Sequence, residues 1–274
     1  MYLPLVAVRG GETLISRSPR PLREGLEEMA DSKDWARCCL AVSGSVAAVK
    51  APEIASLLLD AGVTVEVVVS EAAFRLMQAS YKGARPWDTL AALEARSRQS
   101  ADLPALSIWR DADEWEKYTS VGDDAVLHVE LAKRNQLLLL APLCANSLAN
   151  AALGLCPNLL GSVLRAWYYD LEGEFAAPVA TRCGAYAVSR PVLVAPAMNT
   201  VMWHQRITQQ HLETLRSRGV TVLQPVAKML ACGDTGLGAM AEPATIVREA
   251  LERLRAHVDE AAAAAAAGKP PFQP

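Results

Sequence analysis

The sequence predicts a doubly wound α/β domain with a mostly parallel sheet, and we expect this domain to span residues 36–260. The first observation is the run Leu137–Ala141, which is apolar without a break and stops at Pro142. Such a run is typical of a strand buried on both faces of a parallel sheet. The second is that short apolar or β-branched runs alternate with helical patterns, as in βαβ units. Hydrophobic residues make up 51% of the 274-residue chain, which is enough for a large core.

Each expected element follows from its local pattern. Strands are expected where short apolar or β-branched runs end in turn residues, namely at Arg37–Val42, Thr64–Val69, Leu137–Ala141, Pro191–Ala195 and Thr221–Gln224. Helices are expected where apolar residues recur at helical spacing, at about residues 47–61, 71–77, 124–134, 147–167, 200–218 and 243–267. Asp124 is the expected N-cap of the third helix, and Pro157 marks a joint within the fourth.

The remaining segments show little periodicity. We expect an N-terminal extension over residues 1–35, insertions at about residues 81–120 and 170–190, and a C-terminal tail over residues 261–274. The first insertion is expected to contain some helix. We expect a glycine-rich loop over residues 225–243.

Composition and charge exclude several classes of protein. The net charge is −3 and Lys and Arg form no stripe, so we expect no nucleic-acid partner. The six cysteines form no CxxC pair, so no metal site is predicted, and the expected localisation is the reducing cytoplasm. We expect no membrane span, because polar residues and prolines interrupt the longest apolar region, residues 137–164.

Short polar loops follow four of the expected strands, and they are Ser43–Val46, Ser70–Glu71, Pro142–Ser147 and Pro196–Asn199. Because parallel strands end at one edge of a sheet, we expect these loops to converge on one ligand. Gly44 permits a close approach of the backbone. Helix starts favour a phosphate, and the short polar side chains there are Ser45, Ser70, Asn146 and Ser147. The sequence contains neither GxGxxG nor the P-loop pattern, so the single phosphate of FMN fits better than NAD.

Two further residues have two open interpretations each. His128 lies in an amphipathic stretch and is either a packing residue or an acid/base group that titrates near neutral pH. Cys232 lies in a loop with three glycines and is either an ordinary thiol or an exposed one that gives or takes a proton. We expect His204 and His211, seven apart on one helix, to be surface or packing residues, and His257 to face solvent.

Five blocks of sequence match a known family in order. They are SGSVAA at residues 43–48, VLHVEL at 126–131, APLCANS at 141–147, PAMNT and the following MW at 196–203, and ACGD with GAMAEP at 231–243. Through these blocks, from about residue 38 to 247, the chain resembles the homo-oligomeric flavin-containing cysteine decarboxylases. The resemblance implies a Rossmann-like flavoprotein domain, FMN as cofactor and a homotrimer with active sites between protomers. The implied reaction, in coenzyme A biosynthesis, converts (R)-4′-phospho-N-pantothenoylcysteine to 4′-phosphopantetheine and CO₂.

The resemblance also implies roles for single residues. It implies His128 as catalytic base and Cys232 as proton donor, and it implies substrate binding by Asn199, Met198 and Lys133. The implied contacts with FMN come from the four loops, at Gly44, Ser45, Val46, Ser70, Cys144, Ala145, Asn146 and Ser147. Two positions depart from the family, because many members have Ser in place of Cys144 and Arg in place of Lys133.

Two alternatives stay open beside this activity. One is a peptidyl-cysteine decarboxylase of the same family. The other is a non-catalytic regulatory paralogue, which inhibits a phosphatase or completes a mixed trimer. The presence of His128, Asn199 and Cys232 together favours an enzyme.

Overall fold

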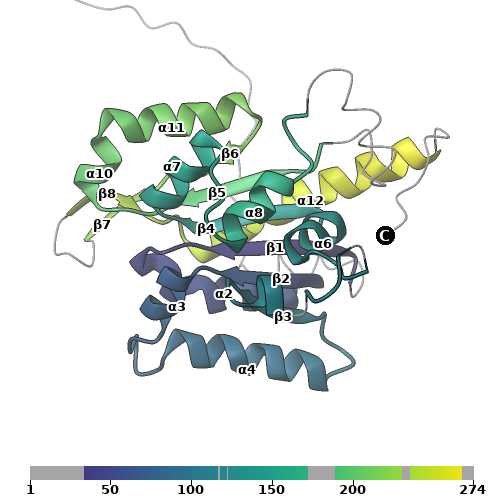
Figure 1. Cartoon of the computed structure of the whole chain (residues 1–274). Helices are drawn as coiled ribbons and strands as arrows, with labels where there is room; N and C mark the ends of the chain where they lie inside the picture. Colours follow the sequence, from purple (N-terminus) through teal and green to yellow (C-terminus); the bar gives the residue numbers. More distant parts are fainter. Residues whose placement is uncertain (1–33, 117, 122, 172–188, 230–234, 267–274) are drawn as a thin grey trace, which may run out of the picture.

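A computed structural model describes residues 34–266 except 117, 122, 172–188 and 230–234 (Figure 1). Its main sheet has six strands, all parallel, in the order β3-β2-β1-β4-β5-β6. The strands are β1 (Ala36–Val42), β2 (Val63–Val69), β3 (Leu106–Arg110), β4 (Leu137–Leu143), β5 (Val192–Pro196) and β6 (Thr221–Val222). A separate antiparallel hairpin consists of β7 (Val226–Met229) and β8 (Thr235–Ala239). The predicted doubly wound α/β class is confirmed.

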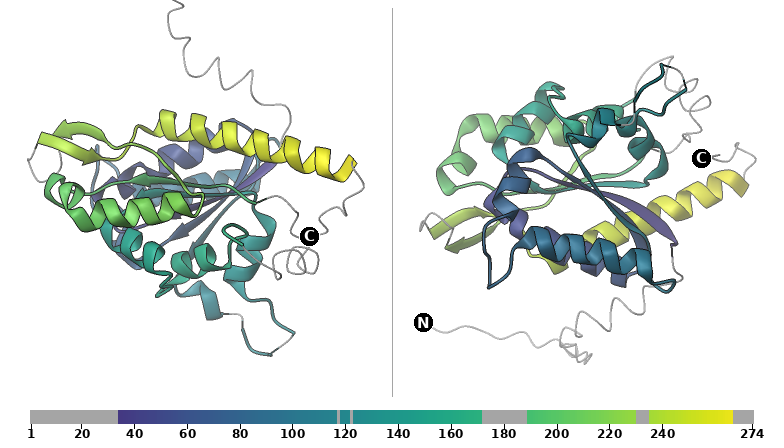
Figure 2. Two further views of the ribbon diagram at one scale, coloured as in Figure 1. Left: turned by 90° about the horizontal axis from the view of Figure 1, so that it is seen from above. Right: turned by 60° about the horizontal axis from the view of Figure 1, so that its bottom comes forward.

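Helices cover both faces of this sheet (Figure 2). One face is covered by η1 (Val46–Lys50), α2 (Ala51–Asp60), α4 (Pro86–Gln99) and α12 (Pro243–Ala266). The other is covered by α6 (Leu127–Arg134), α7 (Ala145–Leu153), α8 (Leu159–Ala166) and α11 (Arg206–Ser217). Three short helices stand at loops, namely α3 (Glu71–Met77), α5 (Asp113–Glu116) and α10 (Thr200–His204). No helix in the described part of the chain is long and apolar enough to cross a bilayer.

The central strand β4 shows why an unbroken apolar run gives a doubly covered sheet. Successive side chains of a strand point to opposite faces. Leu137 and Leu139 therefore pack into the core beneath α2 and α12, whereas Leu138 and Leu140 pack against the helices of the other face. All four are buried, so neither face of β4 meets solvent. The strand continues past the expected end through a cis Ala141–Pro142 peptide bond.

Several elements differ from the expectations. Residues 81–120, expected as an insertion, contain the edge strand β3, which pairs in parallel with β2 and so extends the sheet. The expected glycine-rich loop contains the β7–β8 hairpin. Asp124 does not cap α6: its carboxylate accepts hydrogen bonds from the backbone of Thr119 and Ser120, and Val126 stands at the N-cap without a side-chain bond. The joint between α7 and α8, expected at Pro157, begins earlier, at Gly154, which ends α7 with a left-handed backbone conformation.

Candidate active site

The four predicted loops lie at one edge of the sheet. They follow β2, β1, β4 and β5, which are neighbours in that order and run parallel, and the edge where they end also bears α3, α10 and the hairpin (Figure 1). The chain leaves β1 toward α2 on one face and β4 toward α7 on the other face. A crevice at such a switch point is where open α/β sheets bind ligands.

Ser43 joins the two loops of the switch point, a role that no local pattern in the sequence indicates. Its hydroxyl, fully buried, donates to the Pro142 carbonyl at 2.8 Å and accepts from the Cys144 amide at 2.7 Å. Its own amide also donates to Pro142 at 3.2 Å. The ends of β1 and β4 are therefore held in fixed register by one small polar residue.

The loop after β1 needs a residue without a side chain where it packs against the neighbouring helix α3. A Cβ on Gly44 would lie 2.5 Å from Cβ of Ala72 in α3, so only glycine fits. Ser45 caps η1 by accepting from the Ala47 amide at 3.4 Å, and Val46 is 53% exposed. Gly44 thus permits a close approach, but the partner in the structure is α3.

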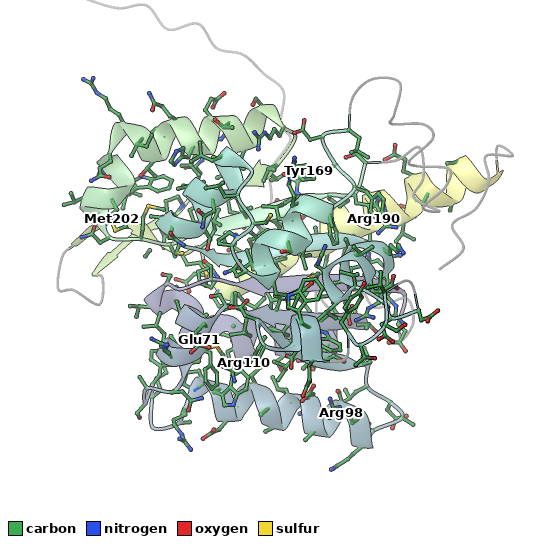
Figure 3. The ribbon with its side chains drawn as sticks, viewed as in Figure 1. Glu71, Arg98, Arg110, Tyr169, Arg190 and Met202 are labelled. Carbon is green, nitrogen blue, oxygen red and sulfur yellow. The ribbon has the colours of Figure 1, made fainter. Side chains whose placement is uncertain are left out.

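Ser70 caps the N-terminus of α3, and the carboxylate of Asp111 binds a second backbone amide at the same helix start. The Ser70 hydroxyl accepts from the Ala73 amide at 3.3 Å. Asp111, at the end of β3, accepts from the Glu71 amide at 3.2 Å and from the Leu159 amide at the start of α8 at 3.1 Å. A negative charge already neutralises this helix start, which disfavours a phosphate there. Figure 3 shows the neighbouring side chains of Glu71 and Arg110, which form an ion pair at 2.9 Å.

The loop after β4 starts α7 with a thiol cap. The Cys144 sulfur accepts from the Ser147 amide at 3.5 Å and lies 3.4 Å from the Ser147 hydroxyl. Both residues are buried, Ala145 is half-buried and Asn146 is exposed. Cys144 therefore performs the capping role that serine commonly has, and the departure from the family pattern leaves the helix start intact.

The loop after β5 is attached to the hairpin. The Met198 amide donates to the Gly238 carbonyl at 2.9 Å. A Cβ on Gly238 would lie 2.3 Å from the Met198 carbonyl oxygen, and one on Gly236 would lie 2.7 Å from the Thr200 side chain. Asn199 caps α10 by accepting from the Met202 amide at 2.9 Å. Cys232, the predicted proton donor, lies outside the described residues. In the sequence it falls between the two strands of this hairpin.

His128 belongs to none of the four loops. It lies in the first turn of α6, the helix that precedes β4, and it faces α5, which follows β3. His128 Nδ1 is 2.5 Å from a carboxylate oxygen of Glu114 in α5. Lys133 pairs with Glu130 at 3.0 Å on the same helix. His128 and Lys133 therefore form a second group of candidate residues, carried by α6 and not by the four loops.

His204 is exposed and His211 is half-buried, as expected for surface or packing residues. They do not share a helix, because His204 ends α10 and His211 lies on α11. His257, expected to face solvent, is only 7% exposed, and burial together with the nearby charge of Arg190 lowers its pKa to about 4. No group of His, Cys, Asp and Glu within the described ranges has the geometry of a metal site.

Comparison with known proteins gives the family. A family model described as Flavoprotein matches residues 27–255. A phosphopantothenoylcysteine decarboxylase of Oryza sativa subsp. japonica is 40% identical over 211 residues, 77% of each chain. A solved PPC decarboxylase mutant complexed with pantothenoylaminoethenethiol is 33% identical, with a TM-score of 0.61 over 80% of this chain and 97% of its own. The FMN-binding protein AtHal3 is 34% identical, with a TM-score of 0.61 over 81% and 97%. The family resemblance in the sequence is thereby confirmed: the chain belongs to the flavoprotein family, with the phosphopantothenoylcysteine decarboxylases among its relatives.

Proposed function

We propose that the chain binds FMN at the switch point and decarboxylates (R)-4′-phospho-N-pantothenoylcysteine to 4′-phosphopantetheine and CO₂. The observation that carries the proposal is the convergence of four loops on one edge of the sheet. One of these loops contains Asn199, the N-cap residue of α10. The names of the relatives supply the substrate class and the cofactor.

The residues of the crevice fit a flavin with one phosphate. The loops after β1 and β4 carry small neutral groups, with the half-buried Ser45 and the exposed Asn146 among them. The Thr200 hydroxyl at the start of α10 is buried without a partner in the described structure, as expected for a group that awaits a ligand. Because Asp111 already occupies the start of α3, we assign the phosphate to the loop after β1 and the start of α7, and we assign Ser70 a supporting role.

Asn199 is suited to a substrate carboxylate. Its side-chain oxygen is used by the Met202 amide, so its two N–H donors are left for another acceptor. A neutral donor holds a carboxylate without the charge pairing that would stabilise the ground state against loss of CO₂. FMN would supply the redox chemistry that makes the carbon next to the carboxylate able to accept electrons. Met198 lies beside Asn199, and we assign it to the same substrate site.

We further propose that the chain works as a homotrimer in the cytoplasm, with His128 as base and Lys133 reaching the substrate from a neighbouring subunit. His128 lies beside α5, which follows β3, whereas Asn199 follows β5 on the other side of the sheet, so the proposal takes the two residues of one site from two copies. The loop edge also exposes apolar side chains that association would cover, among them Val46, Val201 and Met202, which is labelled in Figure 3. Cys232 is the proposed proton donor for the final step.

Product analysis tests the proposal. Purified protein should be yellow, with a flavin band at about 450 nm, and should convert the phosphorylated cysteine substrate to a product that is lighter by CO₂ in mass spectrometry. Asn199→Ala should retain the flavin and lose turnover. Protein that takes up FMN but turns over neither this substrate nor a cysteine-terminated peptide would instead indicate the regulatory paralogue.

A further inference from the structure

We propose that Glu114 is a positioning residue that fixes the tautomer of His128 and so makes its Nε2 atom the basic one. The identity of the reaction rests on the proposed function, but the geometry of the pair does not. Glu114 lies within the segment 81–120, outside the blocks that carry the family resemblance.

The contact between the two side chains is short and sheltered. Glu114 Oε1 lies 2.5 Å from His128 Nδ1, and the Glu114 side chain is only 7% exposed. The His128 side chain is 25% exposed, so its ring still reaches the surface. An ionised carboxylate can only accept a hydrogen bond, so beside it Nδ1 carries the proton. Nε2 of a neutral ring is then left with its lone pair.

The second oxygen of Glu114 strengthens this interpretation. Glu114 Oε2 is buried and has no hydrogen-bond partner among the described residues. A half-satisfied buried carboxylate is costly, since an unsatisfied charged group loses the hydration it had in water. A group that serves only to attach α5 to α6 would be replaced without loss by an apolar residue. Orientation of an imidazole, by contrast, gives a carboxylate at this position a role that an apolar residue could not take over.

Other residues already hold α6 in place, so Glu114 is not needed for that purpose. Arg134 and Asn135, at the end of α6, both donate to the buried Glu66 of β2, at 2.7 Å and 2.6 Å. Arg190, labelled in Figure 3, donates to three backbone carbonyls at the same helix end, among them that of Lys133 at 2.7 Å. The backbone of His128 is therefore positioned from the far end of its helix, and Glu114 determines how the ring is turned.

Glu114→Gln separates orientation from packing, because glutamine has nearly the same shape and no charge. An amide offers Nδ1 a donor as well as an acceptor, so the proton is no longer confined to Nδ1. Loss of the correct tautomer behind a catalytic histidine lowers kcat by up to about 10⁴-fold in a well-studied triad. We expect a fall in kcat of at least about 100-fold with little change in KM, and partial recovery with Glu114→Asp. Glu213→Gln, which removes the exposed partner of Arg216 on α11, is the matched control and should leave kcat unchanged.

Imidazole NMR gives a readout that does not depend on turnover. The chain has four histidines, so the FMN-loaded protein labelled with ¹⁵N-histidine should show four imidazole spin systems. The one that disappears in His128→Gln should carry its proton on Nδ1 in the wild type and change its pattern in Glu114→Gln. An unchanged His128 pattern in Glu114→Gln, or a wild-type ring protonated on Nε2 alone, would overturn the inference.

The two measurements keep this inference apart from the proposed function. Wild-type protein that fails to release CO₂ contradicts the proposed function, whereas the NMR pattern still decides whether Glu114 orients His128. Active wild-type protein with a Glu114→Gln variant of equal kcat contradicts the inference alone. A Glu114→Gln variant that loses kcat and shifts the His128 pattern, with an unchanged melting temperature, supports it.

Discussion

Replacing Ser43 by alanine removes the connection between the loops after β1 and β4. The variant loses the bond to Pro142 and leaves the Cys144 amide buried without its acceptor. A buried donor left unsatisfied costs about 1–3 kcal/mol, and the 3.2 Å bond from the Ser43 amide to Pro142 remains. In a domain of this size, 1 kcal/mol corresponds to about 2–4 °C. We therefore expect the melting temperature to fall by about 2–12 °C.

Thermal unfolding in excess FMN measures this change, and a fluorescence titration measures the affinity for FMN. Because the loops are expected to hold the flavin, the affinity should fall together with the stability. Ser217→Ala is the control, since the Ser217 hydroxyl is exposed and donates to a carbonyl within its own helix, and it should change stability by less than about 0.5 kcal/mol. If Ser43→Ala behaved like Ser217→Ala in both assays, the Ser43 hydroxyl would not be what holds the switch point together.

Three other substitutions test separate parts of the molecule. Gly238→Ala should cost about 2–4 kcal/mol and abolish turnover, because its φ is +136° and its Cβ would lie 2.3 Å from the Met198 carbonyl oxygen. Glu66→Gln should cost about 3 kcal/mol in denaturant unfolding, since it leaves Arg134 without its buried counter-charge. His257 has a pKa lowered to about 4 by burial and by Arg190, so the unfolded chain binds its proton first. Stability should therefore fall by up to about 3 kcal/mol as the pH drops from about 6.5 to 4, and His257→Leu should remove this fall.

Each of these three predictions has a control variant or an outcome that would contradict it. Gly219→Ala shares a positive φ but has open space around the new methyl group, so it should cost only about 1 kcal/mol and retain activity. Equal effects at the two glycines would show that contact with Met198 is unimportant. A Glu66→Gln variant as stable as the wild type would contradict a structural role for that ion pair. An undiminished loss of stability in acid for His257→Leu would assign the titration to other groups.

The core strands were predictable because their sequences carry the pattern of their environment. β4 is apolar along its whole length, and β2 is β-branched except at Glu66, since both faces of each strand are buried. The edge strand β3 lacks that pattern, because residues such as Ser107, Ile108 and Arg110 are only half-buried and its pairing with β2 is a tertiary contact. The β7–β8 hairpin was missed for a similar reason. Glycine has low strand propensity, and here the hairpin is held by packing against Met198 and Thr200 rather than by local preference.

Of the site, only the features that follow from the order of strands and helices could be predicted. Parallel strands must end at one edge, so the convergence of four loops followed from the order of elements. The contacts of Ser43 with Cys144 and of Asp111 with Leu159 join residues 101 and 48 positions apart, and nothing in local periodicity indicates them. Glu114 and His128 are only 14 positions apart, yet they belong to different helices. Their pairing depends on how α5 and α6 pack, which composition does not reveal.

His128 lies beside α5, which follows β3, whereas Asn199 follows β5, and this placement leads to a last prediction about assembly. If each active site takes Asn199 from one subunit and His128 from its neighbour, the inactive variants Asn199→Ala and His128→Gln should complement each other. In a trimer reassembled at random from equal amounts, about a quarter of the sites would receive both intact residues. Activity should therefore return to about a quarter of the wild-type value after co-refolding or co-expression. If both residues served a site within one chain, every site would lack one of them and mixing would restore nothing.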